Sequence, residues 1–167
     1  MAYRVGRREF LVGGGVVAAG LGALWFAGRG EPASAEGFEV SLTPDQWRRR
    51  LSPEQYRVLR EQGTERSGSS PLDREHRRGT FHCAGCGLPV FRSQDKFDSG
   101  TGWPSFVRPI RGNVGTRPDN TLFMTRTEVH CRRCGGHLGH VFDDGPPPTG
   151  RRWCMNGVAL RFVPARG

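Results

Sequence analysis

The sequence predicts a mostly β domain that is prefaced by two short helices. Short runs of alternating apolar and polar residues begin near residue 80 and are separated by turn residues, which is typical of several short antiparallel strands. The chain has 25 glycines and 12 prolines among 167 residues, so loops take a large share of it. No internal repeat or second boundary interrupts residues 36–167. We therefore expect one domain there, with its core over about residues 42–163.

Two helix starts precede the β region. Thr43–Gln46 and Ser52–Gln55 each place a hydroxyl at the N-cap, a proline at N1 and a glutamine at N3, which is the capping-box arrangement. We expect the second helix to end at Gly63 and a polar loop to occupy residues 64–70.

The strand pattern is clearest in four runs. Cys154 is expected to lie at the entry to the last of them, close to the C-terminus. The runs are Thr80–Cys83, Pro89–Arg92, Thr127–Cys131 and Gly157–Val163.

Residues 1–35 are typical of an export signal. A basic segment with adjacent Arg7 and Arg8 precedes an apolar run over residues 11–27, and residues 33–35 (ASA) have the form of a cleavage site. The arginine pair resembles a twin-arginine signal, which predicts a periplasmic or other extracytoplasmic protein. The alternative is an uncleaved membrane anchor, because about 17 apolar residues nearly span a bilayer.

The charge balance leaves one alternative class of function open. The whole chain carries a formal net charge of +9, and removal of residues 1–35 leaves 21 basic and 14 acidic residues, or +7. A zinc-ribbon module that binds nucleic acid without catalysis would fit this charge. Export argues against such a partner, so we expect no nucleic acid.

Four of the five cysteines form two matching turns. Cys83–Cys86 and Cys131–Cys134 are each a CxxC followed by glycine, which permits the tight backbone that brings two thiolates to one ion. Four thiolates suit a closed structural Zn²⁺ site that ties together distant parts of the domain. Two disulfides or a redox CxxC remain alternatives. The predicted zinc ligands are Cys83, Cys86, Cys131 and Cys134.

Cys154 stands apart from these pairs. A lone cysteine is more often a buried structural thiol than a catalyst. Here Arg151 and Arg152 precede it, and two cations would favour the nucleophilic thiolate. Asn156 follows two residues later, so in a strand its side chain would face the same side as that of Cys154.

Two further segments are dense in functional residue types. FDSGTGWPSF at 97–106 packs aromatic residues into a glycine-rich turn, and GHLGHVFDDG at 136–145 brings two histidines beside the second cysteine pair. Taken singly, each histidine could be structural and Trp103 could belong to the core. Together with TEVHCRRCGGHLGHVFDDGP at 127–146 and RRWCMN at 151–156, these segments closely resemble the B-type methionine-(R)-sulfoxide reductases. The resemblance runs from about Leu42 to Phe162 and includes QYRVLREQGTER at 55–66.

The resemblance implies both a fold and a reaction. The fold has two antiparallel sheets in a tent-like β domain, with the zinc tetrad remote from the catalytic cysteine. Cys154 would attack the sulfur of methionine-(R)-S-oxide, mainly in oxidised proteins, and become a sulfenic acid. His140 would manage the proton, with His137 beside it in the HLGH strand. The residues expected to contact substrate are Trp103, Phe106, His137, His140 and Asn156.

One position departs from the family pattern. Many members carry a second, resolving cysteine where this chain has Thr101. Since the other four cysteines are assigned to zinc, we predict that an external thiol, such as that of a thioredoxin-like protein, resolves the sulfenic acid. Gly157 stands where a small hydroxyl residue is common, and Trp153 replaces another aromatic residue. We expect a monomer that meets the membrane only if the signal is uncleaved.

Overall fold

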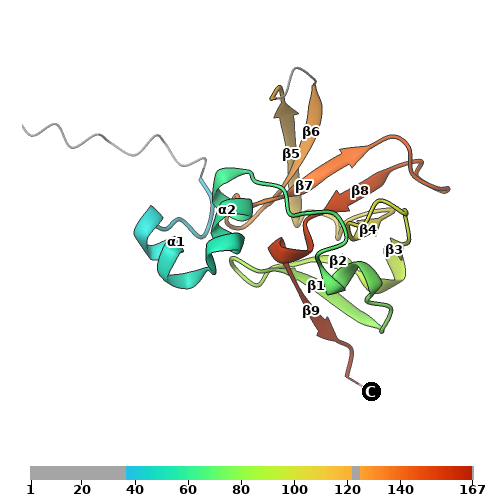
Figure 1. Cartoon of the computed structure of the whole chain (residues 1–167), viewed down its shortest axis with the longest axis horizontal. Coiled ribbons are helices and arrows are strands. Elements are labelled where there is room, and N and C mark those ends of the chain that lie inside the picture. The colour runs from blue at the N-terminus through green and yellow to red at the C-terminus, as the bar shows by residue number, and fades with distance from the viewer. Residues whose placement is uncertain (1–36, 122–124, 167) are drawn as a thin grey trace, which may run out of the picture. The chain divides into compact units, whose positions relative to one another are not determined.

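The computed structural model describes residues 37–121 and 125–166, so the predicted export signal at 1–35 lies outside the described residues. Two α-helices lead into a β region, with short 3-10 turns between some elements (Figure 1). The helices are α1 (Pro44–Arg50) and α2 (Pro53–Glu61), and the 3-10 turns are η1 (Pro71–Arg74), η2 (Ser93–Asp95) and η3 (Gly157–Ala159). The strands are β1 (Gly79–Cys83), β2 (Pro89–Arg92), β3 (Lys96–Phe97), β4 (Ser105–Phe106), β5 (Val114–Asp119), β6 (Arg126–Cys131), β7 (His137–Phe142), β8 (Arg152–Met155) and β9 (Leu160–Pro164).

Both predicted capping boxes are confirmed. Thr43 at the start of α1 and Ser52 at the start of α2 each accept a hydrogen bond from the backbone of the N3 glutamine, whose side chain accepts one in return. The end of α2 differs slightly from the prediction. The helix stops at Glu61 because Gln62 takes the left-handed conformation (φ 55°), and Gly63 only closes the turn.

The strands form two antiparallel sheets, as predicted. One sheet has the order β2-β1-β9 and the other has the order β3-β4-β8-β7-β6-β5. Antiparallel pairing places Cys154 on β8 between Ser105 on β4 and His140 on β7. The central strands of the larger sheet therefore bring three distant segments of the sequence side by side.

The C-terminal strand prediction was partly wrong. Gly157–Val163 was expected to be one strand, but Gly157–Ala159 forms η3 and the strand begins at Leu160. Cys154 consequently lies in β8 of the larger sheet, whereas the last strand, β9, belongs to the smaller one. Local alternation missed this break because a tertiary contact sets the η3 conformation: the Glu65 carboxylate binds its first two amides.

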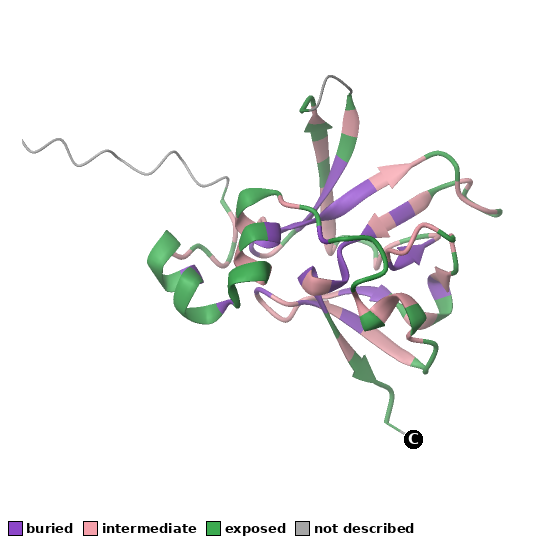
Figure 2. Cartoon of the chain, viewed as in Figure 1, coloured by how far each residue is buried: buried purple, intermediate pink, exposed green. Residues whose placement is uncertain are grey.

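A single hydrophobic core is shared by the two sheets and the helices. Its fully buried members include Phe81 and Phe91 from the smaller sheet, and Phe106 and Leu138 from the larger one. Figure 2 shows the buried segments in the middle of the domain, whereas the outer face of the helices and the end of β9 are exposed. Helix α2 packs against β7 and η3, so it covers the region that follows Cys154.

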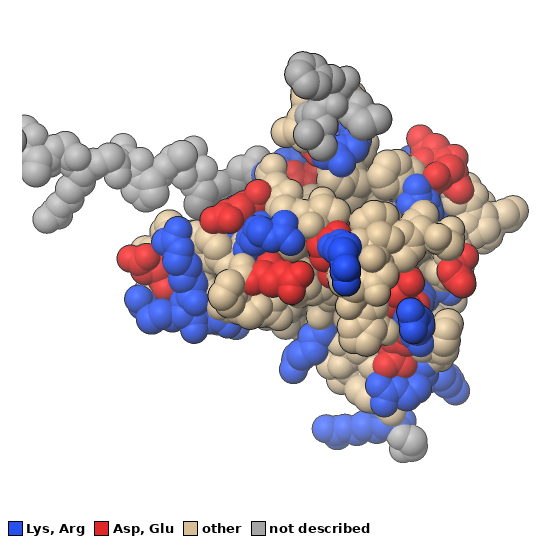
Figure 3. Space-filling model, in the orientation of Figure 1, with Lys and Arg blue, Asp and Glu red and all other residues tan. Residues whose placement is uncertain are grey.

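The surface carries both signs of charge. Figure 3 shows arginines gathered over α1, where Arg48, Arg49 and Arg50 form the last turn, and acidic side chains interspersed with basic ones elsewhere on this face. This mixture on the viewed face does not favour the nucleic-acid-binding alternative. Among the described residues, no helix combines the length and the apolar character needed to cross a membrane.

Candidate active site and metal centre

The four paired cysteines converge on one point. Their sulfur atoms all lie within 4.8 Å of one another. The Cys83 and Cys134 sulfurs are 3.7 Å apart, and those of Cys86 and Cys131 are 3.5 Å apart. A tetrahedral Zn²⁺ ion with Zn–S bonds of about 2.3 Å requires sulfurs about 3.8 Å apart. The four thiols therefore fit a zinc ion, and because all of them are free the two-disulfide alternative was wrong.

This tetrad joins the two sheets. Cys83 and Cys86 lie at the turn between β1 and β2, whereas Cys131 and Cys134 lie at the turn between β6 and β7. Three of the four are almost fully buried, with exposed fractions of 0%, 0% and 2% for Cys83, Cys131 and Cys134. The prediction that the site ties together distant parts of the domain is confirmed.

Cys154 has a different setting, because it lines a pocket of about 140 Å³. Three predicted site residues, Trp103, His140 and Asn156, line the same pocket. They come from the turn before β4, from β7 and from the end of β8. The remaining lining residues are Thr64, Arg126, Gly139, Phe142 and Met155.

The two arginines before Cys154 do not decide the state of its thiol. Burial raises the pKa of Cys154, and Arg152 opposes this rise only in part. Arg152 also pairs with Asp144, with Nη2 to Oδ2 at 2.8 Å, and Arg151 lies 3.7 Å from Asp143. Arg152 therefore favours the thiolate as expected, but the effect of burial on the pKa of Cys154 is larger.

Two hydroxyl groups adjoin the thiol. Thr101 and Ser105 hydrogen-bond to Cys154 and act to lower its pKa against the effect of burial. Ser99 connects them, since its Oγ lies 2.8 Å from Thr101 Oγ1 and 2.8 Å from Ser105 Oγ. Thr101, at the position of the family's resolving cysteine, is thus part of a hydroxyl chain beside the sulfur.

His140 is held by an acidic partner. Its Nε2 lies 2.7 Å from Asp119 Oδ2, and Arg126 donates to the same oxygen at 2.7 Å. Burial lowers the pKa of His140, although the hydrogen bond to Asp119 acts in the opposite direction. The pKa of Asp119 is lowered well below its usual range, chiefly by Thr121 and then by His140. An ionised Asp119 accepts a hydrogen bond from the Nε2–H group of His140, which leaves Nδ1 of a neutral His140 as a base.

His137 is buried behind this site and does not line the pocket. Its Nδ1 lies 2.9 Å from Glu128 Oε1, and its ring packs edge-on to that of His140 with 5.3 Å between centroids. Burial would raise the pKa of Glu128, but hydrogen bonds from His137 and Arg117 outweigh it and hold the pKa at about 2. His137 therefore supports His140, and its predicted substrate contact has no geometric basis.

Trp103 and Asn156 are both anchored to one residue of the 64–70 loop. The Trp103 indole Nε1 donates to the Glu65 carbonyl at 3.2 Å, and Asn156 Oδ1 accepts from the Glu65 amide at 2.9 Å. The Asn156 side chain also donates to the Leu138 carbonyl at 3.2 Å. Asn156 follows the end of β8, so its place beside Cys154 arises from these bonds and not from strand alternation.

Phe106 does not line the pocket either. It is fully buried and stacks on Phe91 with 4.4 Å between ring centroids, so it belongs to the core that supports β4.

Sequence reasoning also missed several residues that line or support the site. The missed residues are Thr64, Glu65, Asp119, Arg126, Glu128 and Phe142. QGTER, as part of a recognised segment, held a signal for the first two, and the recognised segment at 127–146 contains Glu128 and Phe142.

Comparison with known proteins identifies the family. A model described as the SelR domain matches residues 51–164, which include every cysteine of the chain. This chain belongs to the SelR domain family. The resemblance predicted from the sequence is confirmed, and both cysteine sites lie inside the SelR domain.

Relatives of this SelR domain are similar over most of their length. A "Peptide methionine sulfoxide reductase MsrB" of Thiobacillus denitrificans is 56% identical over 123 residues, which are 73% of this chain and 93% of that protein. Its namesake in Bradyrhizobium diazoefficiens is 54% identical, over 75% of this chain and 91% of that protein. One from the archaeon Methanosarcina barkeri is 51% identical, over 74% and 87% respectively.

Proposed function

We propose that this protein reduces methionine-(R)-S-oxide, mainly in oxidised proteins, to methionine, with Cys154 as the nucleophile. The observation that supports this most is the shared pocket of Cys154, Trp103, His140 and Asn156. It offers a thiol, an indole face for the S-methyl group, a base, and an amide beside the reacting atoms. The name of the curated relatives supports the same reaction class.

The reaction balances with one thiol and one sulfoxide. The Cys154 sulfur attacks the sulfoxide sulfur, the S–O bond of the substrate breaks, and the oxygen ends on Cys154 as a sulfenic acid. The methionine sulfoxide is reduced by two electrons to methionine, and the thiol is oxidised by two. His140 Nδ1 takes the thiol proton and returns it to the sulfoxide oxygen, so no net proton is consumed in this step.

Regeneration of Cys154 requires thiols from outside the chain. One external thiol attacks the sulfenic acid and releases water, which leaves a mixed disulfide on Cys154, and a second thiol then frees the enzyme. Thr101 supplies no sulfur, and the other four cysteines face one another in the tetrad. A sulfenic-acid reagent should label Cys154 during turnover. An intramolecular disulfide found by mass spectrometry would contradict this step.

The size of the pocket favours a side chain over a whole ligand. At about 140 Å³ the Cys154 pocket is smaller than the roughly 300–1,000 Å³ of ordinary small-molecule sites. It suits the end of a methionine sulfoxide side chain whose backbone stays outside. We accordingly propose oxidised proteins as the main substrate. We propose separately that the protein works as a monomer.

We also propose that residues 1–35 direct export through a twin-arginine pathway. The arginine pair, the apolar run and the ASA site support this, and a domain that folds around zinc gains from loading its metal before translocation. Replacement of Arg7 and Arg8 by lysine should leave the protein in the cytoplasm. Unchanged secretion of that variant would refute the proposal.

The decisive experiment assays both sulfoxide epimers. Wild-type protein with dithiothreitol should reduce the R epimer of a methionine sulfoxide peptide, and not the S epimer, while Cys154→Ser should reduce neither. Equal activity of wild type and Cys154→Ser would overturn the assignment. Salt-dependent DNA binding at physiological ionic strength, in the absence of reductase activity, would instead favour the nucleic-acid-binding alternative.

A further inference from the structure

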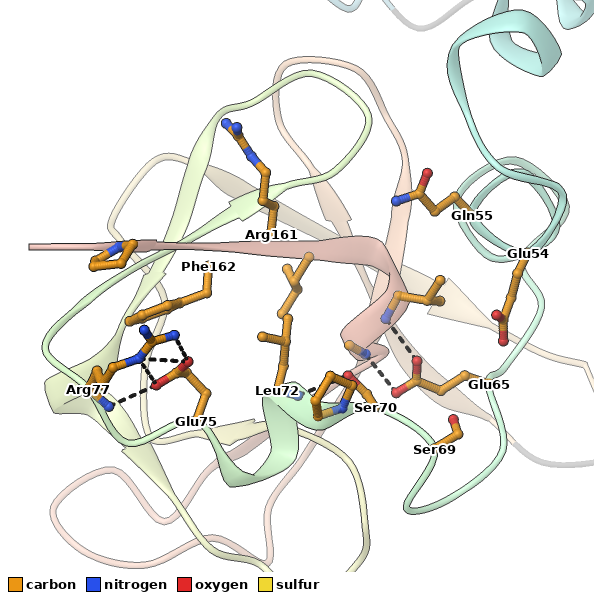
Figure 4. A pocket seen from close by; sticks show the side chains of 15 residues that line it. Glu54, Gln55, Glu65, Ser69, Ser70, Leu72, Glu75, Arg77, Arg161 and Phe162 are labelled. Atoms are coloured by element: carbon orange, nitrogen blue, oxygen red, sulfur yellow. Dashed lines mark hydrogen bonds and ion pairs between the residues drawn. The ribbon is translucent and has the colours of Figure 1, made fainter.

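Glu65 makes contacts that the reaction outlined above does not use. Its loop (residues 64–70) was predicted only as a polar connection, yet the residue is just 3% exposed. A buried carboxylate is costly unless its oxygens are paired. Here Oε1 accepts from the Gly157 amide at 2.7 Å and Oε2 accepts from the Val158 amide at 2.8 Å. Figure 4 shows both bonds, which reach from the 64–70 loop to the start of η3.

The backbone of the same residue reaches both sides of the Cys154 pocket. Its amide donates to Asn156 and its carbonyl accepts from Trp103, two residues that line that pocket. Trp103 precedes β4 whereas Asn156 follows β8, so Glu65 is the shared partner of two separate segments. The preceding residue, Thr64, lines the pocket itself.

Two neighbouring bonds hold the loop against the turn that carries Trp103. Ser67 Oγ donates to the Thr101 carbonyl at 2.7 Å, and the Gly68 amide donates to the Gly102 carbonyl at 2.8 Å. A Cβ atom at Gly102 would collide with Ser67 and with the Gly68 amide, so the two segments are in close contact. The 64–70 loop is thus bonded on one side to residues 101–103 and on the other side to residues 156–158.

We propose that Glu65 is a positioning residue of the active site, which sets the distance between Trp103 and Asn156 across the Cys154 pocket. The inference rests on the proposed function, since those two side chains are the ones assigned to the S-methyl group and the sulfoxide. The carboxylate holds the backbone that follows Cys154, and the peptide group of the same residue holds Trp103. Displacement of one side relative to the other spoils the alignment of the sulfoxide with the thiol.

A matched pair of variants tests this in the full-length protein. Glu65→Gln keeps the size of the side chain but turns one acceptor oxygen into a donor amide, which repels one of the two backbone amides. Glu54→Gln is the control. Glu54 and Glu65 both line the pocket drawn in Figure 4, which is separate from the Cys154 pocket, but Glu54 lies exposed at the start of α2. The measurements are kcat and KM for an R-sulfoxide peptide, alkylation of Cys154 by iodoacetamide, and hydrogen exchange of the Gly157, Val158 and Trp103 indole N–H groups.

Glu65→Gln should lower kcat/KM by roughly 10- to 100-fold. Cys154 should still be alkylated at the wild-type rate, and exchange of the Gly157, Val158 and Trp103 protons should become faster. Glu54→Gln should match the wild type in every measurement. Activity of Glu65→Gln within twofold of wild type would overturn the inference, as would parallel losses of activity and global folding. If wild type reduces neither epimer, the proposed function fails, and the exchange of the Trp103 proton still decides whether Glu65 positions it.

Discussion

The domain has two kinds of cysteine site, a tetrad whose four sulfurs fit a zinc ion and a single sulfur, that of Cys154, in a pocket. In the tetrad, four sulfurs face one another at the junction of the two sheets, and three of the four cysteines are buried. Cys154 lies between β4 and β7 in the larger sheet, half-buried, with hydroxyl groups on one side and a pocket on the other. What separates a structural thiol from a reactive one here is access to a second reactant, and not burial alone.

The largest effect that separates the two sites is expected from Cys154→Ser. Loss of the nucleophile should lower kcat by roughly 10³-fold or more, because no other group in the pocket can accept the oxygen. Zinc content, measured by atomic absorption, and the urea midpoint should stay at wild-type values. Loss of zinc from this variant would show that the two sites are coupled and would break the comparison.

Cys131→Ala should have the reverse effect, with zinc and stability lost and the activity of the folded protein kept. Removal of one ligand releases zinc and leaves the junction of the sheets without its link, so the free energy of unfolding should fall by about 4 kcal/mol or more. Urea unfolding with a zinc assay measures this. Activity should decline only in proportion to the unfolded fraction. A folded, zinc-free variant with lost activity would assign the metal a part in turnover.

The pH dependence of alkylation sharpens the comparison within the active site. Burial raises the pKa of Cys154 above its usual value, so iodoacetamide alkylation should accelerate as the pH rises toward that pKa. Arg152→Ala removes the charge that opposes this rise, so the pKa should move further up and alkylation at pH 7 should slow by about three- to tenfold.

Asp144→Asn is the matched change on the other partner. It leaves Arg152 without its carboxylate, so the Arg152 charge acts more fully on Cys154 and alkylation at pH 7 should become faster. The four zinc-bound thiols should stay unlabelled in both variants. Slower alkylation of Asp144→Asn would contradict the assigned role of Arg152.

A change in stability without a change in zinc content is expected at Gly157. A Cβ there would overlap the side chain of Ser70, so Gly157→Ala should destabilise the fold by about 1–3 kcal/mol. Ser70→Gly should relieve the overlap, and the double variant should then lose less stability than the sum of the two single changes. Additive losses in urea unfolding would show that Ser70 is not the obstacle. Zinc content should not change in any of the three.

Much of the fold could be predicted from local patterns. The capping boxes at Thr43 and Ser52 mark helix starts because a hydroxyl and a glutamine three residues apart satisfy the same exposed amides in any context. The CxxC pairs could be assigned because metal geometry demands four close sulfurs whatever the surrounding chain. The strand predicted over Pro89–Arg92 has the bounds that β2 shows.

The predictions that were wrong have a common cause. The local pattern of Gly157–Ala159 predicts a strand. The buried Glu65 carboxylate, some 90 residues earlier in the chain, instead binds the Gly157 and Val158 amides, and this segment forms η3. The flanking arginines were expected to favour the Cys154 thiolate, and Arg152 does act in that direction, but burial raises the pKa by more. In both cases the packing of residues from distant segments outweighs the local tendency.

The sequence by itself therefore determined the family and the zinc ligands, and it predicted Cys154 as the nucleophile, because each is carried by residue types at short, rigid spacings. The tertiary structure decided which side chains reach Cys154. It brought Thr64 and Asp119 to the site, assigned His137 and Phe106 to its support, and placed Asn156 through Glu65. Such contacts depend on how two sheets pack on one core, and packing is a property of the whole chain that no single segment encodes.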